Sequence, residues 1–475
     1  MQKFKKLTFQ LLDKQHLTIL REIGRVIGVK ASTAKNKETL IRDILDVQNG
    51  VIPPVPYSGR GAPPKIKVDI SEFLENEDYG GDYDDDEESD CKELSFRDAK
   101  TSDGANVAEG VLEQHTSGYG FLRTRNYENG KNDVYVSVQN IKRYRLKRGD
   151  LVKCTYKLTR EGDSVAMQEV ISVNGKSLSE IKNRKDFDEL IPYYPTERLK
   201  LETDDEDFTL RTIDLISPVG MGQRGLIVAP PKTGKTTILK KIAGAIEKNH
   251  PDVKLIILLV DERPEEVTDI KRSVNGEVVF STFDETSEHH VRAAELVVNR
   301  AKRLVEGGQN VVILLDSITR LARAYNNIVE SSGKTLSGGI DPVALQGPKR
   351  IFGSARNIED GGSLTIISTA LVETGSRMDD VIFEEFKGTG NMEIHLSRAL
   401  SERRVFPAID IFKSGTRKEE LLMSEKELAS VYRLRKILSM REENATDIFI
   451  EMLEKTKNNE DLLSKTDAWL KFYEK

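Results

Sequence analysis

The segment GLIVAPPKTGKTT constrains the fold of this chain more than any other feature of its sequence. An apolar run typical of a buried strand leads into a short loop, and Gly234, Lys235 and Thr236 follow directly before the helical pattern ILKKIAGAI. In a phosphate-binding loop, N–H groups at a helix N-terminus surround phosphate oxygens, a lysine reaches the β- and γ-phosphates, and the next hydroxyl binds Mg²⁺. The segment therefore predicts a strand, a nucleotide-binding loop and a helix within an α/β domain.

One position departs from the common phosphate-loop pattern GxxxxGK[ST], because Ala229 stands where its first glycine is expected. Two prolines follow, and we expect them to stiffen the loop instead. The alternative is a chance GKT tripeptide in an ordinary loop. The strand pattern before the loop and the helix pattern after it favour the phosphate site.

Two more strand-like runs end in acidic residues. The run VVILLDS ends in Asp316, the placement of a carboxylate that holds Mg²⁺. The run LIILLVDERPEEV places Glu262 and Arg263 at the strand end, where open α/β sheets bind ligands and a glutamate can polarise an attacking water. The alternatives are a turn residue for Asp316, and for Glu262 a helix-capping acid or a partner of Arg263.

Rapid transfer of a phosphoryl group to water also requires an arginine that neutralises charge in the transition state, worth roughly 10³ to 10⁵ in rate. The candidates are Arg404, in LSERRVFPAID, and Arg417, in IFKSGTRKEEL. The residues alone do not choose between them, because most arginines are solvated surface charges.

Composition and hydrophobic patterning divide the chain into five parts and predict a multidomain α/β protein. The parts are an N-terminal helical unit, a linker that we expect to be disordered, with five prolines in 50–64 and eleven acidic residues in 71–90, a small barrel of five short strands, a doubly wound α/β domain, and a charged helical tail. Their predicted bounds are 1–49, 50–107, 108–176, 177–420 and 421–475.

Aromatic side chains and glycines alternate in the barrel segment GYGFLR. Period two places Tyr119, Phe121 and Arg123 on one face, and Tyr135 adds a ring from a neighbouring strand. Exposed rings on a sheet stack with unpaired bases, each contributing about 1 to 3 kcal/mol. The alternative is that one or two rings point into the core. Charge favours a single-strand binder, because residues 110–176 hold 12 Lys or Arg against 7 Asp or Glu.

Composition also sets limits on the class of protein. No stretch approaches roughly 18 uncharged apolar residues, and the first apolar run breaks too soon for a secretory signal. With only Cys91 and Cys154, a disulfide framework is implausible, and we expect a cytoplasmic protein. The six histidines, among them the pair His289 and His290, show no metal-ligand spacing, and His115 is either a core histidine or part of the barrel face.

Together these motifs resemble the Rho family of bacterial transcription termination factors, over residues 110–422 and the N-terminal unit. The resemblance rests on GQRGLIVAPPKTGKT, LLVDERPEEVT, LLDSITRLARAYN, EEFKGTGNMEIHLSR and SGTRKEELL, and Ala229 also suits that family. It implies an OB-type, cold-shock-like barrel and a RecA/F1-type P-loop ATPase domain that uses ATP and Mg²⁺. The implied protein is a homohexameric, ATP-dependent RNA translocase and RNA–DNA helicase that binds nascent single-stranded RNA and terminates transcription. Its implied partners are RNA polymerase and Nus-type elongation factors, and no membrane.

The same resemblance assigns roles to individual positions. Its catalytic set is Glu262 as the base, Lys235, Arg417 as a finger into a neighbouring subunit's site, and Arg404 as a second arginine there. Nucleotide contacts fall on Lys232, Thr233, Gly234, Lys235, Thr236 and Thr237, with Phe406 on the adenine and with Thr236 and Asp316 on the metal. RNA contacts fall on Tyr119, Phe121, Arg123, Asp133 and Tyr135 in the barrel, and on Lys334 and Arg377 in two loops that line a central channel.

Two departures from the family and two rival functions remain. Val165 stands where the family often has an aromatic residue on the RNA face, so a preference for pyrimidine-rich RNA is less secure. The acidic insertion between about 50 and 106 is hypothesised to inhibit the basic barrel. A rotary or secretion-type ATPase would share the α/β core but lack the aromatic row. An RNA-binding scaffold with structural nucleotide would not need Thr236, Glu262, Asp316 and Arg417 together.

Overall fold

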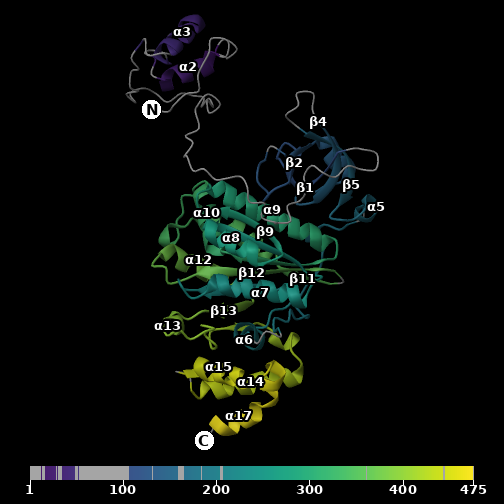
Figure 1. Ribbon diagram of the computed structural model, residues 1–475, viewed down its shortest axis with the longest axis vertical. Helices are drawn as coiled ribbons and strands as arrows, with labels where there is room; N and C mark the ends of the chain where they lie inside the picture. The colour runs from purple at the N-terminus through teal and green to yellow at the C-terminus, as the bar shows by residue number, and fades with distance from the viewer. Residues whose placement is uncertain are drawn as a thin grey trace. The chain divides into compact units, whose positions relative to one another are not determined.

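The computed structural model describes residues 12, 17–27, 29, 35–48, 52, 106–130, 132–158, 165–182, 184–203, 207–359, 361–441 and 444–473. The chain separates into two units, Met1–Ser89 and Asp90–Lys475, each described by itself (Figure 1). Cys91 and nearly all of the acidic insertion lie outside the described residues, so the prediction of a disordered linker stays a prediction.

Two helices form the core of the first unit, α2 (Leu17–Ile27) and α3 (Lys37–Gln48). Their apolar residues recur at helical spacing and bury one another, and those fully buried include Leu20, Ile23, Leu40, Ile41 and Ile44. The Asn36 side chain accepts a hydrogen bond of 3.0 Å from the N–H of Thr39 and so caps the start of α3. The predicted N-terminal helices are therefore confirmed.

Five short strands close a barrel at the start of the second unit, in the order β1-β2-β3-β5-β4. They are β1 (Val107–Gln114), β2 (Gly120–Arg123), β3 (Val134–Val136), β4 (Leu151–Leu158) and β5 (Val165–Val173), followed by the helix α5 (Leu178–Ile181). Helix α4 (Val138–Tyr144) follows β3. Alternate residues point inward, as period two predicts, and they include Cys154, whose thiol pKa burial raises to about 12. The predicted barrel is confirmed.

A largely parallel sheet forms the larger domain, in the order β14-β13-β7-β12-β10-β8-β9. Its strands are β7 (Arg224–Ala229), β8 (Lys254–Glu262), β9 (Glu277–Thr282), β10 (Asn310–Asp316), β12 (Ser363–Leu371), β13 (Met392–His395) and β14 (Gly415–Thr416). Only β14 runs antiparallel along this path. Two short strands, β11 (Arg356–Ile358) and β6 (Pro192–Tyr193), extend the sheet from β12.

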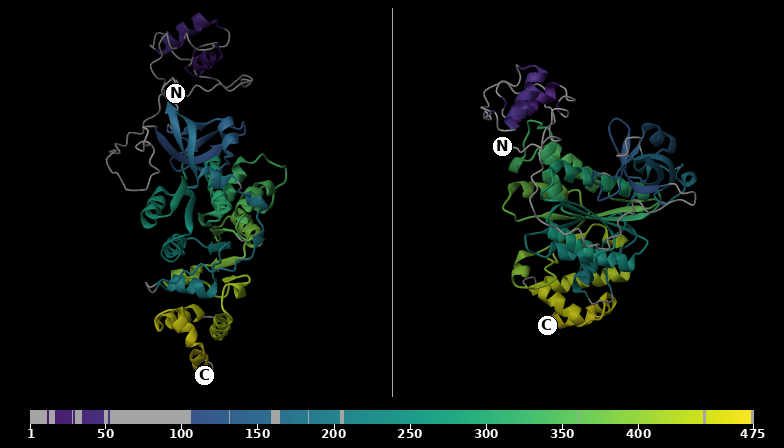
Figure 2. Two further views of the ribbon diagram at one scale, coloured as in Figure 1. Left: turned by 90° about the vertical axis from the view of Figure 1, so that its right-hand side faces the viewer. Right: turned by 45° about the horizontal axis from the view of Figure 1, so that its top comes forward.

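Helices cover both faces of this sheet, as the predicted doubly wound fold requires. One face packs against α9 (Ser287–Glu306), α10 (Ile318–Ile328), α11 (Gln346–Gly353) and α12 (Arg377–Lys387), and the other against α6 (Phe208–Ile216), α7 (Lys235–Asn249) and α8 (Pro264–Ser273). Figure 1 shows α9 and α10 above β12 and α7 below it, and Figure 2 shows the same layers from another side. Shorter helical turns lie at Phe187–Glu189, Ser337–Gly339, Pro342–Leu345, Arg398–Glu402 (α13) and Glu419–Leu421.

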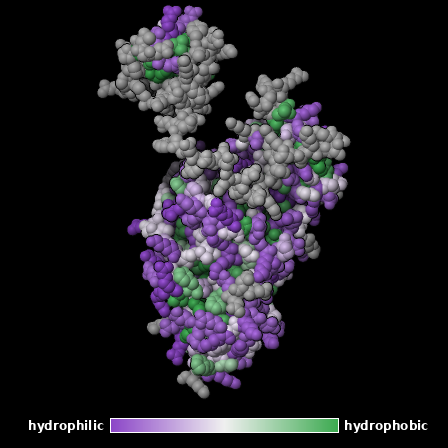
Figure 3. All heavy atoms as spheres, in the orientation of Figure 1, coloured by the Kyte–Doolittle hydropathy of each residue, from purple (hydrophilic) through white to green (hydrophobic). Residues whose placement is uncertain are grey.

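The chain ends in four helices, α14 (Glu425–Ser439), α15 (Ala445–Glu454), α16 (Asn459–Ser464) and α17 (Thr466–Tyr473). Their core takes in Leu215 and Ile216 of α6, and the buried Arg211 donates hydrogen bonds to the carbonyls of Leu453 and Thr456 at 3.0 and 2.9 Å. The helical tail is therefore attached to the large domain. No helix in the described part of the chain is long and apolar enough to cross a membrane, and hydrophilic side chains dominate the face in Figure 3.

Candidate nucleotide and RNA sites

The phosphate loop lies between the end of β7 and the start of α7. Gly234 at the helix N-cap has a φ of 89°, and Lys232 has a φ of 65°, which a residue with a side chain adopts at a cost of about 1 to 2 kcal/mol. The hydroxyl of Thr233 donates to the carbonyl of Pro230 at 2.7 Å and fixes the turn. This backbone opens the N-terminus of α7 toward the carboxyl edge of the sheet, the arrangement that binds phosphate.

Lys235 connects the loop to two neighbouring strands. Its Nζ lies 2.6 Å from Oε1 of Glu262, at the end of β8, and 2.7 Å from Oδ2 of Asp316, at the end of β10. Both carboxylates are 1% exposed. Burial alone would lower the pKa of Lys235, but the charges of Asp316 and Glu262 outweigh it and raise that pKa. The three side chains that the sequence predicted to meet do lie together.

Glu262 lies in surroundings that favour its protonated form. Burial and then the charge of Asp316 raise the pKa of Glu262, against the opposing charges of Lys235 and Arg320. An Arg320 nitrogen lies 3.5 Å from Oε2 of Glu262. A carboxyl group with a raised pKa at the edge of a ligand-binding sheet has the character of a general base.

Sequence reasoning missed three polar neighbours of this site. Thr369 of β12 donates to Oδ1 of Asp316 at 2.7 Å, Thr236 donates to Glu266 of α8 at 3.2 Å, and Arg320 reaches Glu262 from α10. Thr369 does not stand out in the sequence, because its strand SLTIISTAL holds three other hydroxyl residues. The other two contacts depend on how α8 and α10 pack.

The oxygen donors beside the loop suit Mg²⁺. Among the residues that the structure describes, no group of three or more His, Cys, Asp or Glu side chains could hold a metal ion by itself. Mg²⁺ bound with a nucleotide usually takes one or two protein oxygens, and waters and phosphates supply the others. The hydroxyl of Thr236 and the carboxylate of Asp316 fit that pattern.

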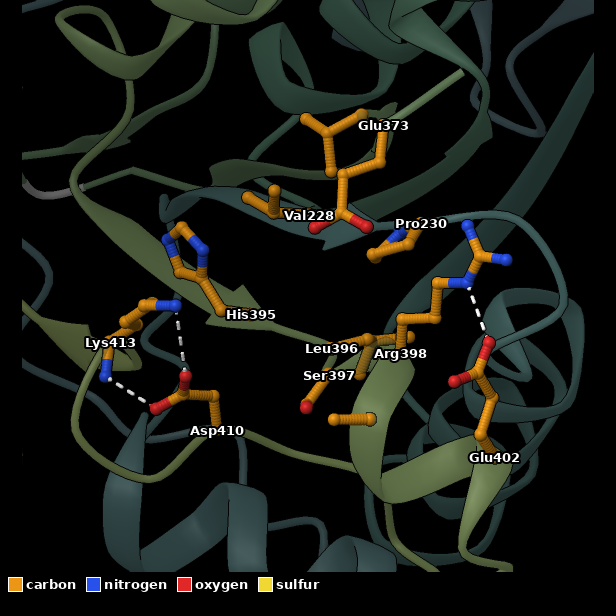
Figure 4. Close-up of a pocket in the computed structure, with 12 residues that line it drawn as sticks. Val228, Pro230, Glu373, His395, Leu396, Ser397, Arg398, Glu402, Asp410 and Lys413 are labelled. Atoms are coloured by element: carbon orange, nitrogen blue, oxygen red, sulfur yellow. Dashed lines mark hydrogen bonds and ion pairs between the residues drawn. The ribbon is translucent and has the colours of Figure 1, made fainter. Parts of the chain in front are cut away.

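A pocket of about 400 Å³ opens beside the loop, where β7, β12 and β13 end. Figure 4 shows polar and charged side chains around it, among them Glu373, His395 and Arg398. The α13 segment at its rim is tied to the phosphate loop, because Ser401 donates to the carbonyl of Lys232 at 3.0 Å. The structure thus brings this segment close to the nucleotide loop.

Arg404 and Phe406 follow α13 on the same segment. Both side chains are exposed, Phe406 by 50%. The N–H of Arg404 donates to the carbonyl of Ser401, the residue that contacts the loop. Both predicted residues therefore lie on the loop side of the sheet and are free to contact a ligand or another chain.

Arg417 lies at the opposite edge of the sheet from the phosphate loop of its own chain. It follows β14, where Thr416 pairs with Met392, and Met392 in turn pairs with Gly225 at the start of β7. The loop begins only after Ala229 at the far end of that strand, about 13 Å further along at 3.3 Å per residue. The structure therefore does not bring the exposed Arg417 to the nucleotide loop of its own chain.

Aromatic rings cover one face of the barrel. The ring centroids of Tyr119, Phe121 and Tyr135 lie 5.8 to 5.9 Å apart, while Leu122 and Gly120 alternate inward. His115 stacks on Tyr119 at 4.9 Å with an interplanar angle of 13°, and it is exposed. The alternative of core-facing rings is wrong, and the histidine that the sequence left undecided belongs to this face.

Arg123 lies beside these rings between two acids. Its guanidinium is 5.1 Å from the centre of the Phe121 ring and pairs with Glu113 at 2.6 Å and with Asp133. The structure thus gathers all five predicted barrel residues, Tyr119, Phe121, Arg123, Asp133 and Tyr135. Val165 is different, because its side chain is buried in the barrel core and not on the ring-bearing face.

The loops that carry Lys334 and Arg377 contact each other. Gly338 has a φ of 81°, and a side-chain carbon there would lie 2.6 Å from the backbone nitrogen of Met378. Asp379 anchors the second loop by accepting hydrogen bonds of 2.8 Å from Arg323 of α10. Lys334 and Arg377 are both exposed. The two loops therefore share one surface of the chain, and their place in a central channel stays a prediction.

Comparison with known proteins bears on both sites. The family model of the Rho termination factor RNA-binding domain matches residues 108–179, and that of the ATP synthase alpha/beta family nucleotide-binding domain matches residues 209–416. Over 355 residues the chain is 55% identical to the transcription termination factor Rho of Bacillus subtilis (strain 168), covering 74% of this chain and 83% of that protein. The chain belongs to the Rho family.

Other similar proteins bear on the same assignment. The Rho of Pseudomonas aeruginosa is 55% identical over 360 residues, which are 74% of this chain and 86% of that protein. A solved ATPase from a bacterial type III secretion system shares the fold, with a TM-score of 0.50 and 23% identity over 60% of this chain and 88% of that one. The fold of the α/β domain is thus shared, but the Rho RNA-binding domain sets this chain apart from that rival. The protein carries an RNA-binding barrel and an ATPase domain of the Rho family.

Proposed function

We propose that this Rho-family protein is an RNA-stimulated ATPase that moves along single-stranded RNA as a homohexameric ring and unwinds RNA–DNA hybrids to end transcription. The observation that carries the proposal is that one compact unit joins a ring-bearing basic barrel to a loop in which Lys235 meets Glu262 and Asp316. A nucleotide bound only for structure would not require a buried base beside the lysine. RNA polymerase and Nus-type elongation factors are the proposed partners, in the cytoplasm, where transcripts emerge.

The proposed chemistry uses side chains that already lie together. Lys235 and the N-terminus of α7 hold the terminal phosphates of ATP, and Lys232 adds a second cation at the loop. Glu262 accepts the proton of the attacking water, for which its raised pKa suits it. Thr236 and Asp316 would hold Mg²⁺. When bound, that ion neutralises the charge of the phosphate oxygens.

A ring of copies accounts for the position of Arg417. This residue is exposed and lies at the edge of the sheet opposite its own phosphate loop. We propose that it reaches the ATP of a neighbouring copy and stabilises the transition state there, with Arg404 at the same junction. Phe406 stacks on the adenine in this arrangement.

RNA follows a path over two surfaces. Unpaired bases stack on Tyr119, Phe121 and Tyr135, while Arg123, positioned by Asp133, contacts the strand. The strand then enters the ring, where Lys334 and Arg377 contact its phosphates. Because both loops connect to α10 or α12 near the ATP site, movement at that site can displace them.

Phosphate release in the presence of a single-stranded pyrimidine RNA tests this proposal. We expect RNA to increase ATP hydrolysis at least about tenfold, and Lys235→Ala to abolish hydrolysis at all RNA concentrations while barrel binding to RNA persists. Hydrolysis at the wild-type rate by Lys235→Ala would remove the loop from the mechanism. RNA binding without any hydrolysis by the wild type would instead favour the scaffold.

A further inference from the structure

The RNA-binding face of the barrel is fastened to the edge strand of the ATPase sheet. In the turn between β2 and β3, the side-chain amide of Asn126 donates to the carbonyl of Phe280 at 2.9 Å and accepts from its N–H at 3.0 Å. The next residue, Tyr127, is 5% exposed, and its hydroxyl donates to Glu277. Both partners belong to β9, so the turn occupies the open edge of that strand.

One carboxylate links the RNA face to helix α9. Oε2 of Glu113 accepts from Nε of Arg123 at 2.6 Å, and Oε1 of the same side chain accepts from Nε of Arg292 at 2.7 Å. A terminal nitrogen of Arg292 also donates to the carbonyl of Tyr127 at 2.8 Å. Arg292 therefore binds both the strand that carries Glu113 and the docked turn.

The linked charges are balanced only while Arg292 is in place. Arg123 and Arg292 face Glu113 and Asp133, and the side chains of all four are between 6% and 21% exposed. Burial alone would raise the pKa of Glu113, but Arg292 and Arg123 outweigh it and lower that pKa. Without Arg292, the single cation Arg123 would face two carboxylates, and a net negative charge would lie beside the RNA phosphates.

Helix α9 leads from Arg292 to the neighbourhood of the catalytic base. Two residues earlier on this helix, the ring of His290 lies 2.9 Å from the hydroxyl of Ser281 in β9. Ser281 pairs with Val260 of β8, two residues before Glu262, and the N–H of Phe283 donates to the carbonyl of Glu262 at 3.1 Å. A continuous series of contacts thus joins the RNA face to the end of β8.

We propose that Arg292 is a positioning residue that couples RNA binding on the barrel to the nucleotide site, by fixing Arg123 through their shared partner Glu113. The proposal rests on the proposed function, because it takes the ring-bearing face as the RNA site. Coupling of this kind is reciprocal, so nucleotide binding changes RNA affinity by the same factor as RNA changes nucleotide affinity.

The test compares the full-length wild type with Arg292→Gln. Binding of a fluorescent oligocytidylate is measured with and without adenylyl imidodiphosphate and Mg²⁺, together with the RNA concentration that half-saturates ATP hydrolysis. We expect Arg292→Gln to weaken RNA binding and raise the half-saturating RNA concentration by about 5- to 20-fold, while the rate at saturating RNA changes less than about twofold. The effect of nucleotide on RNA affinity should also disappear.

Two further variants separate positioning from a general loss of structure. Lys176→Gln removes another barrel contact to the same helix, the 2.7 Å bond from Lys176 to the carbonyl of Gly307, and should behave as the wild type. Arg292→Lys keeps the charge and should restore part of the RNA affinity. Within Glu113→Gln, the change Arg292→Gln should weaken RNA binding much less than it does in the wild type, because the shared partner is gone and only the bond from Arg292 to the carbonyl of Tyr127 is left to lose.

The outcomes distinguish this inference from the function on which it rests. If the wild type binds RNA but Arg292→Gln binds it equally well and keeps the nucleotide effect, the inference is wrong and the proposed function stands. Equal losses for Arg292→Gln and Lys176→Gln would also overturn it. Absence of RNA binding by the wild type would overturn the proposed function itself. If Arg292→Gln fails to fold, loss of the nucleotide effect in Glu113→Gln supports the inference, and its persistence refutes it.

Discussion

Lys235 is placed to leave the carboxylates of Glu262 and Asp316 for the phosphates of a bound nucleotide. Its ammonium lies within 2.7 Å of two buried carboxylates, and a phosphate group carries the same sign of charge as they do. A bound nucleotide therefore competes with Glu262 and Asp316 for this lysine. In the proposed mechanism Lys235 turns to the phosphate, so Glu262 loses its nearest cation and becomes a stronger base, as activation of the attacking water requires.

Glu113 gives a pH-dependent prediction at the same scale. Arginines hold its pKa below the ordinary value of 4.5 in the folded protein, so its contribution to stability is present above that value and lost as the pH falls through the lowered pKa. We expect Glu113→Gln to lose about 2 kcal/mol of stability at pH 7 and much less at a pH below the lowered pKa of Glu113. Thermal unfolding of both proteins at the two pH values measures this, and a gap that does not change with pH would contradict it.

The sequence predicted single residues well where one local motif specifies the chemistry. Asp316 ends one apolar strand, and Lys235 and Thr236 follow another after a short loop, so their common edge could be predicted from the parallel fold. Arg320, Glu113 and Arg292 could not, because each acts across a contact between segments far apart in the chain. The sequence did not decide whether His115 lies in the core or on the barrel face, because the alternation of inward and outward side chains is lost in the turn after β1.

Helix α9 organises the contact between the barrel and the ATPase domain. Its C-terminal half meets the turn before β4, where Gly149 has a φ of 91° and a side-chain carbon would lie 2.4 Å from the backbone carbon of Asn299. Only glycine permits so close an approach of two backbones. The fit of the barrel on α9 thus depends on one residue without a side chain.

Gly149→Ala should separate the barrel from α9. The added methyl must displace backbone atoms and the residue must keep a positive φ, so we expect a loss of about 2 to 4 kcal/mol. Gly175→Ala is the matched control, because Gly175 has a φ of 75° and no atom within 4 Å, and it should cost only about 1 kcal/mol. Chemical denaturation measures the free energy of unfolding of both variants. Equal losses would contradict the close contact between the turn at Gly149 and helix α9.

Elements with a clear period were predicted, and short or partner-dependent ones were not. The barrel strands and β7, β8, β10 and β12 follow from alternation or from continuous apolar runs. The strand β9 escaped prediction because its sequence EVVFST shows neither strict alternation nor a long apolar run, and β14 because it is only two residues long. Such strands depend on neighbours that local sequence does not reveal.

At the scale of the whole molecule, Lys235 and Arg417, the two groups proposed to act on ATP, lie too far apart in one chain to serve one nucleotide. Lys235 follows the carboxyl end of β7, and Arg417 lies beside its amino end. A head-to-tail ring of identical copies solves this, because each junction then joins the loop of one copy to the arginine of the next. In the proposed ring, ATP hydrolysis is a property of the assembly, and the barrel faces give that assembly its response to RNA.

ATP hydrolysis by mixed assemblies tests this central claim most directly. Lys235→Ala and Arg417→Ala are each expected to be inactive alone with saturating RNA. In a random one-to-one assembly of the two, about a quarter of the junctions would pair an intact loop with an intact arginine. The account predicts that co-expressed, co-purified mixtures regain RNA-dependent hydrolysis. Mixtures as inactive as the separate variants, or full activity of Arg417→Ala alone, would contradict it.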